Sequence, residues 1–120
     1  MFNWFKKKEK DLKKQNKLDY SKIDSNQKAA DLFNKGELSK IYLMPLEFGG
    51  MESPMNSLYV PKFAQALKNK FDKTIEELLI NGKKLSYSTE PEYKGNSFIP
   101  SKLTINVSGD SEFQEVIEIW

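Results

Sequence analysis

The strongest constraint on the fold of this chain is an apolar stripe that follows Pro61. Apolar residues recur there at three- and four-residue spacings, which is the period of a helix with one buried face. They are Phe63, Leu67, Phe71, Ile75, Leu78 and Leu79. Pro61 suits the first turn of a helix, where its missing N–H is not needed, and Gly82 suits the end. One such helix is not stable alone, so the chain must supply a sheet for it to cover.

The charged residues of the same segment, Lys68 and Asp72 among them, fall between the apolar positions. A helix that covers a sheet turns such residues towards solvent. We therefore expect them on the exposed side of the helix.

Three segments of the C-terminal third alternate apolar and polar residues, as strands with one packed and one exposed face do. The residues on the side predicted to be packed are Leu85, Tyr87, Thr89, Leu103, Ile105, Val107, Phe113, Ile117 and Ile119. The run Ser-Gly-Asp-Ser at residues 108–111 is typical of a turn. We therefore expect the last two strands to form a hairpin.

The N-terminal half predicts one short helix and two short strands. Ser25 is a suitable N-cap for a helix over residues 26–35, and Gly36 is a suitable end. Residues 40–44 and 57–60 are β-prone, and the segment 45–56 between them is rich in glycine and proline, as loops are. Together these elements predict a single α+β domain over residues 25–120. Its antiparallel sheet would have four to five strands, with the long helix packed on one face.

Residues 1–24 are predicted to form a lysine-rich N-terminal arm, helical or disordered. Residues 1–40 contain eleven lysines and six acids, a net charge of +5, whereas residues 41–120 contain eight lysines and eleven acids, a net charge of −3. A basic arm with Phe2, Trp4 and Phe5 beside its lysines leaves one alternative open. The arm could act at an anionic membrane surface or on nucleic acid.

The 120-residue chain contains no histidine, cysteine or arginine. Histidine is the usual general base near neutral pH, thiolates are nucleophiles and zinc ligands, and arginine forms bidentate contacts with phosphates. Catalysis by carboxylates or lysine stays conceivable. The glycine pair Gly49-Gly50 does not have the sequence of a phosphate-binding loop, because Met51-Glu52 follows it and the glutamate would repel a phosphate. We therefore expect no enzyme, no cofactor and no metal site. Neither a secretory signal nor a run of about 18 apolar residues is present, so we expect a cytoplasmic protein.

Two segments have the composition of a protein-binding surface. Residues 45–56 place aromatic and methionine side chains beside acids, and residues 89–100 place aromatic side chains beside two glutamates. Flexible methionines, aromatic anchors and acidic rims suit contact with a basic partner. The candidate contacts are Glu47, Phe48, Met51, Glu52, Met55, Glu90, Glu92, Tyr93 and Phe98. The alternative for the first segment is that Phe48 and the methionines fold back onto the core.

The same segments carry a resemblance to a known group of proteins. Residues 44–50 read MPLEFGG, residues 56–61 read NSLYVP and residues 91–100 read PEYKGNSFIP. Over residues 40–120 the chain resembles small uncharacterised bacterial proteins encoded beside polymorphic toxins of the RHS or contact-dependent type and regarded as their immunity proteins. The resemblance implies a cytoplasmic protein that neutralises a cognate toxin, such as a nuclease, by binding it and covering its active site.

Overall fold

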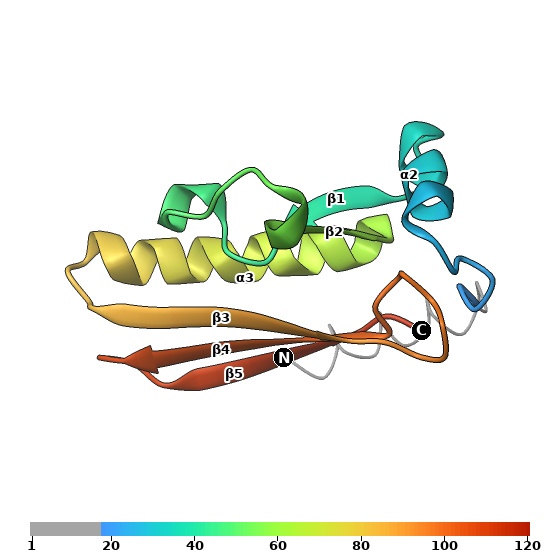
Figure 1. Ribbon diagram of the computed structural model, residues 1–120. Helices are drawn as coiled ribbons and strands as arrows, with labels where there is room; N and C mark the ends of the chain where they lie inside the picture. Colours follow the sequence, from blue (N-terminus) through green and yellow to red (C-terminus); the bar gives the residue numbers. More distant parts are fainter. Residues whose placement is uncertain (1–17) are drawn as a thin grey trace.

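The computed structural model describes residues 18–120 as an α+β fold, as predicted (Figure 1). The helices are α2 (Asn26–Asn34) and α3 (Lys62–Ile80). The strands are β1 (Ser39–Tyr42), β2 (Ser57–Val60), β3 (Leu85–Glu92), β4 (Lys102–Gly109) and β5 (Phe113–Glu118). Two short 3-10 helices, η1 (Leu46–Phe48) and η2 (Pro54–Asn56), lie between β1 and β2.

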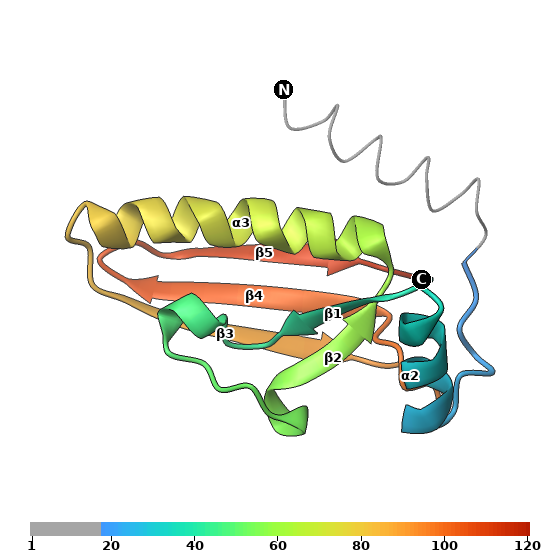
Figure 2. The ribbon, with the colours of Figure 1, turned by 90° about the horizontal axis from the view of Figure 1, so that it is seen from above.

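The prediction of one sheet with four to five strands is wrong. The five strands form two antiparallel sheets, β1-β2 and β3-β4-β5. The smaller sheet lies beside α3, and both cover the same face of the larger sheet (Figures 1 and 2). Ile41 and Val60 of the smaller sheet are buried in the core that α3 shares with β4 and β5. Because its apolar residues point onto the face of the larger sheet, β1-β2 packs on that sheet and does not extend its edge.

The predicted helices and hairpin are confirmed. The Ser25 side chain accepts a hydrogen bond from the main-chain N–H of Lys28 and caps α2, and α3 begins directly after Pro61. β4 pairs with β5 in the predicted hairpin, with Ile105 opposite Glu115. These elements need only local patterns to form, which is why the sequence predicts them.

The larger sheet has β4 at its centre and β3 and β5 at its edges. Its inner face and α3 bury the side chains of Ile75, Leu103, Ile105 and Ile117. Its outer face carries the alternate, mostly polar residues, and Glu90 and Glu92 lie there, exposed. β3 continues to Glu92, so these two glutamates belong to a strand and not to the predicted loop.

The last residues of the predicted arm lie against the globular body. Tyr20 and Ile23 pack against a second apolar cluster of Ala29, Leu38 and Ile99. The predictions made for residues 1–17, including the helical or disordered arm and its contact with membranes or nucleic acid, lie outside the described residues. Across residues 18–120, no helix has the length and apolar character needed to cross a membrane.

Candidate protein-binding site

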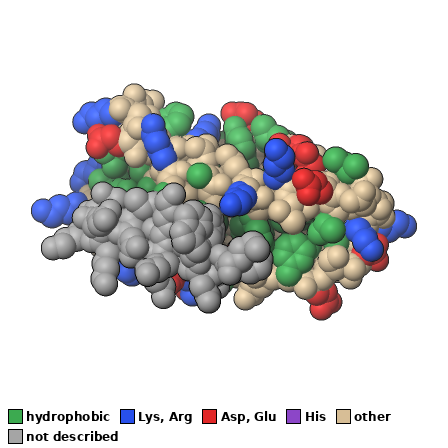
Figure 3. All heavy atoms as spheres, turned by 180° about the vertical axis from the view of Figure 1, so that it is seen from behind, with side chains coloured by type: hydrophobic (Ala, Val, Ile, Leu, Met, Phe, Trp, Pro, Cys, Tyr) green, Lys and Arg blue, Asp and Glu red, His purple; other side chains and the backbone are tan. Residues whose placement is uncertain are grey.

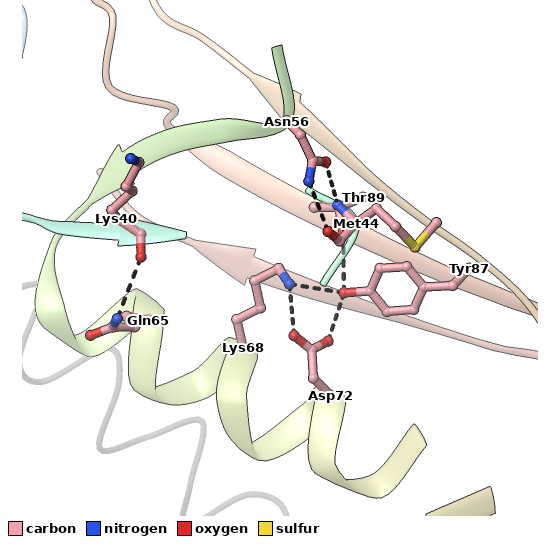
Figure 4. A network of polar contacts seen from close by, with 8 residues as sticks. All are labelled: Lys40, Met44, Asn56, Gln65, Lys68, Asp72, Tyr87 and Thr89. Carbon is pink, nitrogen blue, oxygen red and sulfur yellow. Dashed lines mark hydrogen bonds and ion pairs between the residues drawn. The ribbon is translucent and has the colours of Figure 1, made fainter. Parts of the chain in front are cut away.

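The segment from Met44 to Asn56 is held in one conformation by the side chain of Asn56 (Figure 4). Its Oδ1 accepts a hydrogen bond from the main-chain N–H of Met44 at 2.8 Å. Its Nδ2 donates to the main-chain carbonyls of Met44 at 2.9 Å and Met51 at 2.8 Å. One amide therefore joins the two ends of the loop and its middle, since Asn offers both donors and an acceptor.

Gly49 and Gly50 serve this closed loop in different ways. Gly49 has φ +99°, a left-handed conformation that residues with a Cβ rarely adopt. At Gly50 a Cβ would lie 1.9 Å from the main-chain oxygen of Met44. The two glycines therefore allow a tight turn and a close approach of two main chains.

We expect Asn56→Asp to lower the free energy of unfolding by about 2–3 kcal/mol. The change is nearly isosteric, but it replaces the two donated hydrogen bonds with a carboxylate oxygen that faces two carbonyl oxygens. Urea unfolding measures the loss. Asn96→Asp, at an exposed loop residue, is the matched control and should change the stability by less than about 0.5 kcal/mol. Equal effects of the two variants would contradict the role given to Asn56.

The second predicted segment is also anchored, and two aromatic side chains project from it. Ser97 and Ile99 are buried, and the indole Nε1 of Trp120 donates to the carbonyl of Ile99 at 3.1 Å. The exposed fractions of Tyr93 and Phe98 are 47% and 48%. A fixed main chain with half-exposed aromatic rings suits a binding surface, because little order has to be gained when a partner binds.

A groove of about 300 Å³ lies where the two segments meet. It is bordered by β2, by η2 and the residues before it, by the start of α2 and by the segment after β3. Its lining residues are Asn26, Lys40, Glu52, Ser53, Pro54, Ser57, Leu58, Tyr59, Tyr93 and Phe98. The lining combines aromatic and apolar side chains with a few polar groups, which is the usual composition of a recognition site.

Glu52 supplies negative charge at this groove. Its carboxylate lies 3.8 Å from the Nζ of Lys40, and both side chains are substantially exposed. A hydrogen bond with the Glu52 carboxylate raises the pKa of Tyr42. The ion pair is solvated and adds little stability, so Glu52 is free to exchange Lys40 for a cation on a partner.

The groove brings together only three of the nine predicted contact residues, namely Glu52, Tyr93 and Phe98. Met51 and Met55 belong to the same loop and are strongly exposed, Met55 with an exposed fraction of 91%. We call the groove, together with the exposed Met51 and Met55 of the loop beside it, the groove surface. Tyr59 of β2 also lines it, and nothing in the sequence singles that residue out, because a short β-prone run does not reveal which edge of the strand is free.

The other four predicted contacts lie elsewhere. Phe48 packs edge-on against the ring of Tyr87, with ring centroids 5.5 Å apart, so the alternative in which it folds back onto the core is correct. That alternative fails for Met51 and Met55, which are exposed. Glu47 is exposed beside Phe48. Glu90 and Glu92 lie on the outer face of β3, where Glu92 forms an ion pair with Lys102 at 3.2 Å.

Lys68 is not on the exposed side of α3, and that expectation is wrong. Its exposed fraction is 2%, and its Nζ donates to Asp72 Oδ2 at 2.7 Å and to the Tyr87 hydroxyl at 2.9 Å (Figure 4). The Tyr87 hydroxyl donates to Asp72 Oδ1 at 2.6 Å, and Thr89 donates to that hydroxyl at 3.3 Å. Two features of the sequence could have indicated that Lys68 is buried. Asp72 follows it at the i,i+4 spacing, and Tyr87 is on the side of its strand predicted to be packed.

This buried network is a structural link between α3 and β3. Each polar group in it has a partner within the ring of bonds, and among residues 18–120 no buried side-chain N or O atom lacks one. Burial and the hydrogen bond to the Asp72 carboxylate raise the pKa of Tyr87 far above its usual range. The network joins α3 to β3, and its Tyr87 hydroxyl keeps its proton at neutral pH.

We expect the free energy of unfolding to fall as the pH rises above about 10. The pKa of Tyr87 is raised in the folded protein, so the folded state holds this proton more tightly than the unfolded chain. That stability is complete below the unfolded pKa and is lost as the pH rises. Urea unfolding midpoints measured between about pH 8 and pH 11 should fall less in Tyr87→Phe than in the wild type. Tyr42→Phe is the comparison variant: Tyr42 is outside the network, so this change should reduce the fall in stability less than Tyr87→Phe does.

The site offers no place for a metal ion within the described part of the chain, where no group of three acidic or other ligating side chains converges. Compared with the models of known protein families and with curated proteins, the sequence matches none. The functional conclusion therefore depends on the geometry and chemistry of the groove surface.

Proposed function

We propose that this protein is a non-enzymatic, immunity-type protein that binds a cognate toxin domain and covers its active site. The binding surface in this proposal is the groove surface. The observation that carries the proposal is that two segments about 40 residues apart in the chain meet there and present Tyr93 and Phe98 half-exposed beside Glu52.

The aromatic residues supply the contact area that protein interfaces concentrate in a few anchors. Tyrosine lowers the entropic cost of binding because its ring has few rotatable bonds, and it can also donate a hydrogen bond at the rim. Met51 and Met55 add unbranched side chains that can adapt to the shape of a partner. Such a surface recognises a folded protein better than a small molecule, because its polar groups do not converge on one point.

The charge of the body adds a preference for a basic partner. Residues 41–120 have a net charge of −3, and Glu52 contributes at the groove itself. An acidic surface accelerates encounter with a basic protein such as a nuclease, and the acceleration falls with ionic strength. The part of the molecule that the grey residues leave visible in Figure 3, seen from behind, has charges of both signs interspersed with apolar side chains.

The proposal predicts that a toxin domain is encoded beside this gene, and co-expression with that domain tests it. We expect the two chains to purify together in equal amounts, and growth of the host to be restored. Raising the salt concentration during purification should not separate the two chains, because the anchors are apolar. A toxin domain that neither binds the protein nor is neutralised by it would contradict the proposal.

A further inference from the structure

The two-stranded sheet leaves one main-chain edge of each strand unpaired. The N–H of Leu43 donates to the carbonyl of Asn56 at 2.9 Å, which sets the alternation of the ladder. Directly opposed residues in an antiparallel pair alternate between bonded and non-bonded pairs. Ile41–Leu58 and Ser39–Val60 are therefore bonded pairs, and Lys40–Tyr59 is a non-bonded pair whose main-chain groups point away from the sheet.

The two outward edges have different surroundings. On the β1 side, the carbonyl of Lys40 accepts a hydrogen bond from Nε2 of Gln65 on α3 at 3.5 Å (Figure 4). On the β2 side, no hydrogen bond within residues 18–120 uses the main-chain N–H or carbonyl of Tyr59. The edge of β1 is thus covered by the long helix, whereas β2 keeps one donor and one acceptor on the same residue.

The groove follows this open edge of β2. Ser57, Leu58 and Tyr59 all line it, although successive side chains of a strand point to opposite faces. A groove that three consecutive residues of one strand line passes along the side of that strand, and Lys40 of β1 also reaches it. Pro54 lies towards one end, Asn26 towards the other, and Tyr93 and Phe98 supply the apolar wall.

We propose that the edge of β2 accepts an extended segment of a partner protein as a third strand of the β1-β2 sheet. The segment would exchange two main-chain hydrogen bonds with Tyr59, and an apolar side chain next to the paired residue would lie against Tyr93 and Phe98. This is recognition by strand addition, in which main-chain bonds give affinity and side-chain pockets give specificity. It rests on the proposed function only in that the partner is a protein, and it names how part of that protein binds.

The edge of β3 is a poorer acceptor than the edge of β2. The N–H of Asp110 donates to the carbonyl of Lys84 at 2.9 Å, so Leu85, Tyr87, Thr89 and Pro91 are the outward positions of β3. Pro91 has no N–H to offer at one of them. It also shows that this fold tolerates proline at an outward position of an edge strand.

A library of displayed linear peptides of about eight residues, the length of a long strand, supplies the probe. Panning on the wild-type protein should enrich sequences that alternate apolar and polar residues. N-methylation of the best peptide, one residue at a time, should weaken binding by about tenfold at the one residue that pairs with Tyr59, the loss expected for one main-chain hydrogen bond in a dry site, and should have little effect at its two neighbours. Failure to enrich any peptide, or equal effects at successive positions, would overturn the proposal.

On the protein side, Tyr59→Pro removes the outward N–H and fills the edge, and Tyr59→Val keeps the N–H while it also removes the ring. Peptide binding should be lost in Tyr59→Pro and should fall much less in Tyr59→Val, and equal losses in the two variants would overturn the proposal. In the wild type, amide exchange of Tyr59 should slow when the peptide binds, which tests the edge without any substitution. Protection of Gln114, Val116 and Glu118 on the edge of β5 would overturn the assignment to β2. So would a wild-type dimer that Tyr59→Pro abolishes, because the edge would then pair with a second copy.

The two proposals fail separately. A toxin domain that binds Tyr59→Pro and the wild type equally well would overturn strand addition and leave the proposed function standing. A peptide that meets every expectation above, with no toxin domain bound, would overturn the proposed function and leave the strand-accepting edge.

Discussion

Asp72→Ala is expected to lower the free energy of unfolding by about 3–5 kcal/mol, because it leaves a buried charge without its partner. The side chain of Lys68 is only 3% exposed, and Asp72 and the Tyr87 hydroxyl are its hydrogen-bond acceptors. Removal of Asp72 also takes away the acceptor of the Tyr87 hydroxyl. Urea unfolding, followed by circular dichroism, measures the loss.

Two controls separate the buried charge from other effects of the substitution. Glu76→Ala, at an exposed position of the same helix, should change the stability by less than about 0.5 kcal/mol. The double variant Lys68→Met, Asp72→Leu removes both charges and should regain most of what Asp72→Ala loses, since apolar replacement of a buried pair is often close to neutral. A loss below about 1 kcal/mol in Asp72→Ala would contradict the description of the network as a buried link between α3 and β3.

The double variant Tyr93→Ala, Phe98→Ala is expected to weaken binding of the toxin domain by at least about a hundredfold. Both rings line the groove and project from a segment whose main chain is fixed by Ile99 and Trp120. Their half-exposed state means that the folded monomer loses little apolar burial when they are truncated. Isothermal titration of the purified domains measures the affinity, and urea unfolding checks that the variant remains folded.

Val116→Ala is the matched control for that pair. Val116 is an apolar residue with an exposed fraction of 41%, close to the fractions of Tyr93 and Phe98, but it lies on the outer face of β5. Its truncation should leave the affinity within about twofold of the wild-type value. A larger loss in Val116→Ala than in the double variant would place the interface on the outer face of the sheet.

The sequence predicts those parts of the fold that depend on neighbouring residues. The apolar stripe after Pro61 yields α3, Ser25 caps α2, and alternation yields β3, β4 and β5. The division into two sheets is not predictable in this way. It depends on whether Ile41 and Val60 point onto the face of the larger sheet or the strands pair with its edge, and both arrangements have the same local pattern.

The site was less predictable than the fold, because local patterns do not show how distant segments of the chain meet. Composition selects loops with aromatic and acidic residues, and Glu52, Tyr93 and Phe98 do meet. Composition does not say where a strand ends or which of its faces lies near a groove. Glu90 and Glu92 therefore look like contact residues of a loop, although they lie on the outer face of β3. Lys68 shows the converse error, because a lysine between apolar positions looks exposed until Asp72 and Tyr87 are seen to surround it.

The absence of histidine, cysteine and arginine from the chain has a clearer meaning beside this structure. The one buried cluster of lysine, carboxylate and tyrosine described in residues 18–120 is closed on itself by hydrogen bonds. The exposed features gather instead at the groove surface, where apolar and acidic groups lie on an anchored main chain. These exposed features support the proposal that the molecule acts by covering another protein.

Hydrogen exchange of the complex with the toxin domain tests this central claim most directly. Binding at the groove surface predicts slower amide exchange in residues 51–59 and 93–98, and unchanged exchange at the residues of β5 on the opposite side of the larger sheet. Slower exchange confined to β5 and the outer sheet face, with residues 51–59 and 93–98 unchanged, would contradict it.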